Sequence, residues 1–342
     1  MSADGLTRYF KTSPEEFVSL PAGRQVCRIH PKSVLDGFRQ VEIKPPHLYL
    51  STEKAGEVRC SKVKNKKMID THAHLNFPLF LKKINQTINQ SQKAGVKAVI
   101  IASSNLKDSQ KAVNLAQKHP HFLFASVGIH PQNTLPQQTL PPNQQLNLLD
   151  QLLAQNSKQI VAIGETGLDF SPPPPGEKQR TIEEQETLFL GQINLSLKYR
   201  LPLIIHAREA NDEVLEILQS LPVTQQKNLK GVFHCYSAGR KRVQKILNLP
   251  GSWYFGFDGN LTYDEGLQNI ITAIPPERIL IETDSPFLAP LPFRNQTNTP
   301  VNLPLIQKKI NEIFQKDLTS QIFQNTLCLF SSLSKTLSQT PH

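Results

Sequence analysis

Histidine and carboxylate residues stand at the ends of short apolar segments in this 342-residue sequence. His72 and His74 are separated by one residue at the end of the segment that begins at Met68. Alternate residues of a strand lie on the same face, so the two imidazoles are expected to point the same way. Imidazole is a common ligand of divalent transition metals, and this pair therefore predicts part of a metal site.

Four more ligand-type side chains stand at the ends of four further apolar segments, namely Glu165, His206, His234 and Asp284. A lone histidine at such a position is more often structural than a ligand. A carboxylate at the end of a buried strand, however, is costly unless it is paired or bound to metal. Four histidines and two carboxylates are enough for two divalent ions that share one carboxylate.

The elements that must bring these residues together alternate regularly from Met68 onward. Apolar, β-branched segments predict eight strands, at residues 68–72, 96–102, 122–130, 160–169, 201–207, 231–237, 252–259 and 279–284. Amphipathic stretches predict helices at 79–94, 106–118, 142–156, 183–199, 209–221, 240–247 and 263–274, with a final pair at 303–314 and 318–333.

Eight strands that alternate with helices predict an α/β fold, the (β/α)₈ TIM barrel. A doubly wound open sheet is the alternative, but the sequence lacks the glycine-rich loops that often follow its first strand. In a barrel, the carboxyl ends of all strands meet at one mouth, where the active sites of this fold lie. The six candidate ligands are therefore expected to converge there.

The charge of the chain is concentrated near its beginning. The whole sequence has 38 Lys and Arg against 28 Asp and Glu, a formal net charge of +10. Residues 1–67 contribute +6 of this and lack the periodic apolar pattern of a packed domain. Two interpretations are open for them: a short, basic, disordered N-terminal extension, or a mis-annotated start ahead of Met68. The barrel domain is expected at 68–342.

Composition excludes several classes of protein. The four cysteines form no C-x-x-C pair and are too few for a disulfide scaffold. No apolar run approaches the length that spans a membrane, and the first residues carry acidic side chains where a signal peptide needs an apolar stretch. We therefore expect a cytoplasmic protein with no membrane partner, and the sequence gives no oligomeric state.

From Met68 to about residue 335, the chain resembles the TatD family of metal-dependent nucleases, within the amidohydrolase-like barrels. The resemblance does not cover residues 1–67, and family members begin at the position of Met68, which favours the mis-annotated start. The matching motifs are MIDTHAHL (68–75), GIHP (128–131), GETGLDF (164–170), Gln185/Phe189/Gln192, IHAREA (205–210), FHCYSAG (233–239) and ETDSPFLAP (282–290).

This resemblance implies a 3′–5′ exonuclease or deoxyribonuclease that acts on single-stranded DNA or DNA 3′ ends, with RNA as a further substrate. It implies two divalent ions per subunit, either Mg²⁺, Mn²⁺ or Zn²⁺, and Asp284 and Glu165 as the catalytic residues, with Asp284 as both ligand and general base. The implied ligands are His72, His74, Glu165 and Asp284 for one ion, and Glu165, His206 and His234 for the other.

Substrate contacts are expected from residues near the same strand ends. His130 follows the third strand, and Arg208 lies two residues after His206. Arg294 falls after the eighth strand, in a loop whose spacing departs from the family pattern. Arginine suits phosphate contacts. Tyr236 and Phe287 are candidates for stacking on bases, although packing is the commoner role of such residues.

Two other functions remain open at this point. The same barrel and ions could cleave esters or amides, as in an aminoacyl-tRNA deacylase or a small-molecule amidohydrolase. A basic groove beyond the ions would favour the nuclease, and a closed apolar pocket would favour the alternative. A non-catalytic nucleic-acid-binding module built on residues 1–67 is the third option, although the presence of all six ligand-type residues argues for catalysis.

Overall fold

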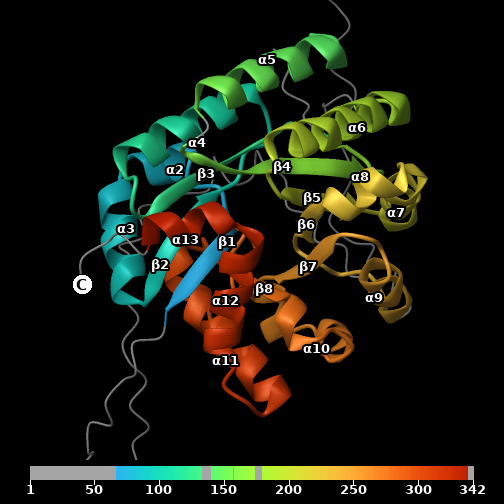
Figure 1. The fold of residues 1–342 in the computed structure, drawn as a ribbon. Coiled ribbons are helices and arrows are strands. Elements are labelled where there is room, and N and C mark those ends of the chain that lie inside the picture. Colours follow the sequence, from blue (N-terminus) through green and yellow to red (C-terminus); the bar gives the residue numbers. More distant parts are fainter. Residues whose placement is uncertain (1–66, 133–139, 157, 174–178, 338–342) are drawn as a thin grey trace, which may run out of the picture. The chain divides into compact units, whose positions relative to one another are not determined.

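The computed structural model describes residues 67–132, 140–156, 158–173 and 179–337. The N-terminal segment, for which a disordered extension and a mis-annotated start are the two interpretations, lies outside the described residues except for Lys67. Eight parallel strands follow one another around a single sheet in chain order (Figure 1). They are β1 (Met68–Ala73), β2 (Val96–Ile101), β3 (Leu123–Val127), β4 (Ile160–Asp169), β5 (Leu203–Arg208), β6 (Lys230–Phe233), β7 (Ser252–Phe257) and β8 (Ile279–Ile281).

The ring of strands is closed at its carboxyl end, where β8 leads back to β1. The Asp284 amide donates to the His72 carbonyl at 2.9 Å, and the His74 amide donates to the Ser285 carbonyl at 2.7 Å. Ala73 and Ser285 form a parallel bridge between these two bonds. The expected (β/α)₈ barrel is thus confirmed.

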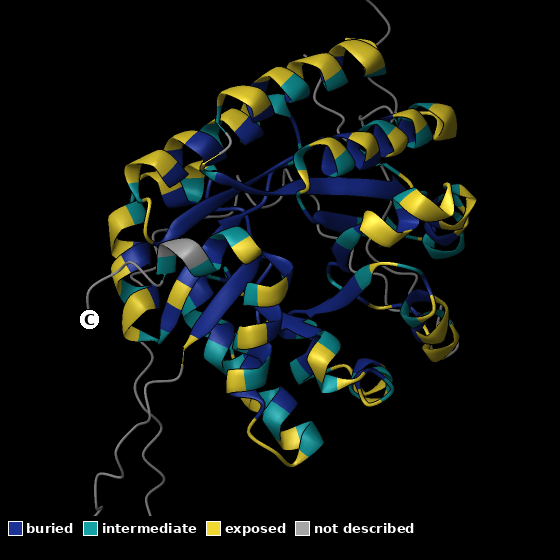
Figure 2. Cartoon of the chain, viewed as in Figure 1, coloured by how far each residue is buried: buried dark blue, intermediate teal, exposed yellow. Residues whose placement is uncertain are grey.

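Helices lie on the outside of the strands, with their exposed faces outward and their buried faces toward the strands (Figures 1 and 2). They are α2 (Pro78–Leu81), α3 (Ile84–Lys93), α4 (Leu106–Lys118), α5 (Pro142–Gln155), α6 (Ile182–Tyr199), α7 (Asn211–Ser220), α8 (Val223–Asn228), α9 (Arg240–Leu247), α10 (Glu265–Ile271), α11 (Leu303–Phe314), α12 (Thr319–Leu329) and α13 (Ser331–Leu337). At the start of α6, the Thr181 hydroxyl accepts from the Glu184 amide while the Glu184 carboxylate accepts from the Thr181 amide, a capping box that satisfies two backbone donors.

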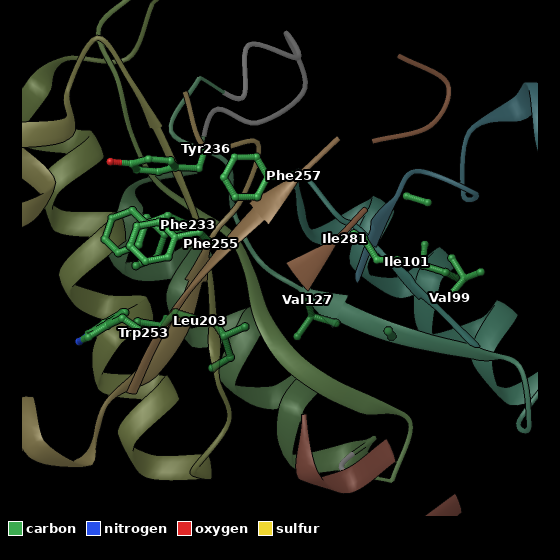
Figure 3. Close-up of a cluster of buried hydrophobic side chains, with 14 of the residues drawn as sticks. Val99, Ile101, Val127, Leu203, Phe233, Tyr236, Trp253, Phe255, Phe257 and Ile281 are labelled. Atoms are coloured by element: carbon green, nitrogen blue, oxygen red, sulfur yellow. The ribbon is translucent and has the colours of Figure 1, made fainter. Parts of the chain in front are cut away.

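Two apolar clusters hold the barrel together. The larger one fills the space between strands and helices, and part of it, an aromatic group that includes Phe233, Trp253 and Phe255, is shown in Figure 3. The smaller one draws residues from all eight strands, which can meet only inside the ring, and adds Leu329, Phe330 and Leu333 from the last two helices and their junction. The C-terminal helices therefore contribute to the barrel interior.

Sequence patterns located most elements closely, and the differences have physical reasons. The strand at 160–169 and the helices at 106–118, 240–247 and 303–314 are confirmed to the residue. The strands predicted at 122–130, 231–237 and 279–284 are wrong at their carboxyl ends, because β3, β6 and β8 end three to four residues earlier, where the chain leaves the sheet. Cys235 and Asp284, for example, adopt positive φ angles of 47° and 51°, which end an extended strand.

Two of the predicted helices are interrupted in the structure. The single helix expected at 79–94 is two helices, α2 and α3, and the one expected at 318–333 is also divided, into α12 and α13. The short helix α8 was not predicted. It follows Pro222, which sets the backbone at its start, and its sequence has too few apolar residues to show a period.

Gly167 in β4 should be intolerant of any side chain. Its φ is +136°, and a β carbon would lie 2.0 Å from the His206 carbonyl oxygen of β5. We expect Gly167→Ala to lower the free energy of unfolding by about 2–3 kcal/mol, measured by urea denaturation of metal-free protein.

The matched control is Gly239→Ala, where no atom of the described part of the chain lies within 4 Å of the added carbon. It should cost less than about 1 kcal/mol. Equal losses in the two variants would contradict the steric argument.

Candidate metal centre

The six expected ligands gather at the carboxyl end of the barrel. Side chains from strand ends and from the loops that follow strands form three compact groups, in each of which the ligand atoms lie within 4.8 Å of one another. They are His72–Glu165–His234, His72–His74–Asp284 and His130–Glu165–His206. All six predicted residues belong to at least one group, and His130 joins them.

Glu165 is the centre of this arrangement. It is 4% exposed, and it follows Gly164 in β4 through a cis peptide bond. Its Oε1 atom lies 2.8 Å from His206 Nδ1, 3.1 Å from His234 Nε2 and 3.6 Å from His130 Nε2. Its Oε2 atom lies 3.5 Å from His72 Nε2. One carboxylate therefore faces four imidazoles, the arrangement expected of a shared ligand between two ions.

The second group lies beside the first and is linked to it through His72. Asp284 Oδ1 is 3.6 Å from His72 Nε2 and 3.4 Å from His74 Nε2. The His72 ring also stacks on His234 at a centroid distance of 4.0 Å. The hydrogen bonds that close the barrel run through the backbones of these same ligands, so the closure fixes their spacing.

The donor set suits divalent metal ions. His72 is fully buried, yet neither of its ring nitrogens makes a hydrogen bond to any described residue, and the same holds for His74 Nδ1. Buried polar atoms without partners are costly, and a cation would satisfy the nitrogens that converge with carboxylates. Imidazole with carboxylate is the ligand chemistry of Zn²⁺ and Mn²⁺. The residues present therefore fit the expected cofactor.

Neighbouring histidines lower the pKa values of the two carboxylates, whereas burial would raise them. Burial alone would raise the pKa of Glu165, but the neighbouring histidines, foremost His234, hold it well below its usual range. The pKa of Asp284 is lowered for a similar reason, since His74 and His72 outweigh its desolvation. Both carboxylates are therefore ionised at neutral pH and available to cations.

The pKa values of His206 and His234 are shifted in the opposite direction from that of His130. Burial lowers the pKa of His206, but Asp169 and Glu165 more than compensate and raise it to about 9. The pKa of His234 is also raised above its ordinary value, because Glu165 and Glu282 outweigh its desolvation. Burial instead lowers the pKa of His130 to about 4. Without metal, His206 and His234 therefore carry protons at neutral pH, whereas His130 is neutral.

Two glutamines of α6 fasten the strand ends that carry the site. Gln192 accepts from the Ile129 amide at 2.8 Å and donates to the Ile129 carbonyl at 3.0 Å, next to His130. Gln185 makes the same pair of bonds with the backbone of Asp169, at 2.9 and 3.1 Å. The two glutamines are seven residues apart, so they lie on the same, buried face of the helix. Polar residues at this spacing on an apolar face are the sequence signal for such an anchoring role.

The three predicted substrate contacts occupy different environments. His130 Nδ1 accepts from the Gln132 amide at 3.0 Å, which leaves Nε2 toward Glu165. Arg208 is the last residue of β5 and is partly exposed. Arg294 is exposed and stacks over the Tyr263 ring at 4.3 Å.

The two aromatic candidates differ as well. Tyr236 is wrong as a stacking residue, because it is 3% exposed and packs edge-to-face on Phe255 in the core. Phe287 is partly exposed, and its ring centroid lies 6.0 Å from both His74 and Phe77. It therefore remains accessible beside a candidate ligand.

The fold and the side chains at its mouth define a metal-dependent hydrolase of the (β/α)₈ barrel class. A family model described as "TatD related DNase" matches residues 69–331, so the chain belongs to the TatD family. Within the described residues, no helix is long and apolar enough to cross a membrane.

Comparison with individual proteins agrees with this membership. The chain is 35% identical over 236 residues to an uncharacterized metal-dependent hydrolase of Mycoplasma pneumoniae, covering 68% of this chain and 85% of the relative. It is 30% identical over 275 residues to the 3′-5′ ssDNA/RNA exonuclease TatD of a Pantoea species, covering 77% and 99%. The solved structure of YJJV, a TatD homolog of Escherichia coli, matches with a TM-score of 0.67 and 26% identity, covering 78% and 99%.

Metal affinity should rise with pH, because a cation must displace the protons of His206 and His234. Below the His206 pKa of about 9, each displaced proton makes affinity rise by about tenfold per pH unit. Calorimetric titration of metal-free protein with Mn²⁺, between about pH 6.5 and 8.5, measures this slope.

Repeating the titration in buffers with different ionisation enthalpies counts the protons released. Release of none, with affinity independent of pH, would contradict the raised pKa values.

Proposed function

We propose that this chain is a two-metal phosphodiesterase that removes nucleotides from the 3′ end of single-stranded DNA, and of RNA as well. The observation that carries the proposal is Glu165, whose two oxygens face different histidines and which belongs to two of the three compact ligand groups. The names of the TatD relatives, among them the ssDNA/RNA exonuclease of Pantoea, support the choice of substrate.

Two divalent ions would be held by His72, His74, Glu165, His206, His234 and Asp284, with Glu165 between them. The resemblance assigns His206 and His234 to the same ion, and both contact the same Glu165 oxygen. Such ions supply a more acidic water and positive charge for phosphate oxygens. Their identity is proposed as Mg²⁺, Mn²⁺ or Zn²⁺.

Asp284 is the proposed general base. Its Oδ1 atom faces His72 and His74, and its lowered pKa keeps it ready to accept a proton from the attacking water. The residue is 9% exposed, so it can reach a molecule that enters from the mouth. The neutral His130 and the cation of Arg208 are proposed to contact the phosphate, while the exposed Arg294 contacts the strand farther out.

The aromatic pair Phe77 and Phe287 favours a nucleotide over a small ester. Both rings are partly exposed, they meet edge-to-face, and His74 lies beside each of them. Nucleobases stack on such side chains without regard to sequence. The second candidate, an ester or amide hydrolase, has the same ions. A small-molecule ester or amide offers no base to this pair, whereas an aminoacyl-tRNA ends in a nucleotide, so a deacylase is separated from the nuclease by the cleavage assay below.

Cleavage of a 5′-labelled oligonucleotide tests the reaction directly. Wild-type protein with Mg²⁺, Mn²⁺ or Zn²⁺ should shorten the strand from its 3′ end, and Asp284→Asn should reduce the rate constant by about 10²–10⁴-fold because the base is lost. Glu165→Gln should abolish turnover.

Asp212→Asn is the control, since this carboxylate pairs with Arg242 and Lys245 on the outer helices. Full activity of Asp284→Asn would contradict the base assignment. Hydrolysis of an aminoacyl ester, with no nucleotide release under any ion, would favour the second candidate.

Phe287→Ala should weaken substrate binding more than turnover. Base stacking contributes about 1–3 kcal/mol, so KM for a single-stranded oligonucleotide should rise by about 5–150-fold. A substrate with an abasic 3′-terminal nucleotide should lose most of this difference.

Leu291→Ala is the matched control, because Leu291 is an apolar residue of the same loop and is 47% exposed. Equal effects of Phe287→Ala on normal and abasic ends would show that the ring does not stack on that base.

A further inference from the structure

His206 and His234 share a geometric pattern. His206 presents Nδ1 to Glu165 Oε1 at 2.8 Å and Nε2 to Asp169 Oδ2 at 3.1 Å. His234 presents Nε2 to the same Glu165 oxygen at 3.1 Å and Nδ1 to Glu282 Oε1 at 3.3 Å. Each ring therefore lies between the shared ligand and a second carboxylate that belongs to none of the compact ligand groups.

Asp169 is itself held in place. Its Oδ1 atom accepts from the Ser171 amide at 2.9 Å and from the Ser171 hydroxyl at 2.6 Å, which leaves Oδ2 for His206. The Gln185 side chain of α6 accepts from the Asp169 amide and donates to the Asp169 carbonyl. The carboxylate therefore has one orientation, and that orientation faces the imidazole.

Glu282 occupies a space that the fold keeps open for it. It is fully buried, and its two oxygens accept from the Cys235 amide and from the Thr71 hydroxyl. At Gly256 of β7, a β carbon would lie 2.5 Å from Glu282 Oε2. Its contact with His234 is at ion-pair distance, without hydrogen-bond alignment.

The histidines of the neighbouring group have no such support. Among the described residues, His72 and His74 form ion pairs only with Glu165 and Asp284 through Nε2, and no carboxylate is paired with their Nδ1 atoms, which also make no hydrogen bond. The site is therefore asymmetric. One half has a carboxylate behind each histidine, and the other half does not.

We propose that Asp169 and Glu282 are positioning residues, which hold the far nitrogens of His206 and His234 and so determine how tightly these two rings bind an ion. A carboxylate behind a ligating imidazole fixes its orientation, places the proton on the far nitrogen and increases the basicity of the near one. The ion at His72, His74 and Asp284 depends on neither carboxylate. This inference rests on the two-ion centre of the proposed function.

Metal titration of Asp169→Asn and Glu282→Gln tests the inference without any substrate. Metal-free protein is titrated with Co²⁺, followed by calorimetry and by the visible absorption of the bound ion. Wild-type protein should show two sites. In each variant one site should keep its affinity, and the other should weaken by about 10–100-fold with a changed absorption spectrum.

Asp108→Asn is the matched control, because Asp108 is a partly buried carboxylate that pairs with Lys111 and Asn105 and forms no ion pair with a histidine of the described segments. It should leave both sites unchanged. Gly256→Ala provides an independent variant: the added methyl group should displace the Glu282 carboxylate and weaken the same site as Glu282→Gln. Thermal unfolding of each metal-free variant, followed by circular dichroism, confirms that it is folded.

The outcomes separate the two proposals. Unchanged affinity at both sites in the folded variants, or equal weakening at both, would overturn the positioning role. If wild-type protein binds a single ion, the two-ion centre is overturned. In that event, weaker binding of that ion in both variants supports the positioning role, and unchanged binding overturns it.

Discussion

A buried carboxylate surrounded by imidazoles is the constraint on which the rest of this structure depends. Glu165 is almost fully enclosed, and burial of an ionised carboxylate is unfavourable unless positive charge or hydrogen-bond donors surround it. Its four histidine neighbours come from β1, β5 and the loops after β3 and β6. The barrel brings these segments together, because its strands run parallel and end at one mouth.

The closure of the barrel and the assembly of the site are the same event. The backbone bonds between β1 and the segment after β8 involve His72, His74, Asp284 and Ser285. His72 of β1 thereby meets Asp284, which is 212 residues later in the chain. The Thr71 hydroxyl donates to the Ile281 carbonyl across the same seam. Loss of closure would separate two members of one ligand group.

Support for the ligands extends outward in layers. Behind two of the histidines lie Asp169 and Glu282, and behind Asp169 lies Gln185, which is anchored on α6. Polar side chains that are fully buried must be paired, and here the pairing also fixes direction. The outer helices therefore do more than cover the strands, because α6 holds the ends of β4 and of the segment after β3.

The sequence by itself determined the fold class and the six candidate ligands, because strand and helix periods and the types of residue at strand ends are local signals. It also placed β4 and three helices to the residue. Strand ends, the divided helices and the short α8 were not predicted, since left-handed backbone and joints carry little periodic signal.

Only the tertiary structure decided which partner each side chain meets. Asp169 and Glu282 stand within motifs that the sequence displayed, yet nothing local shows that they face His206 and His234. Tyr236 is adjacent to the site along the chain, but it turns into the core. These outcomes depend on contacts between strands far apart in sequence, such as the space that Gly256 leaves for Glu282, and such contacts exist only once the barrel has closed.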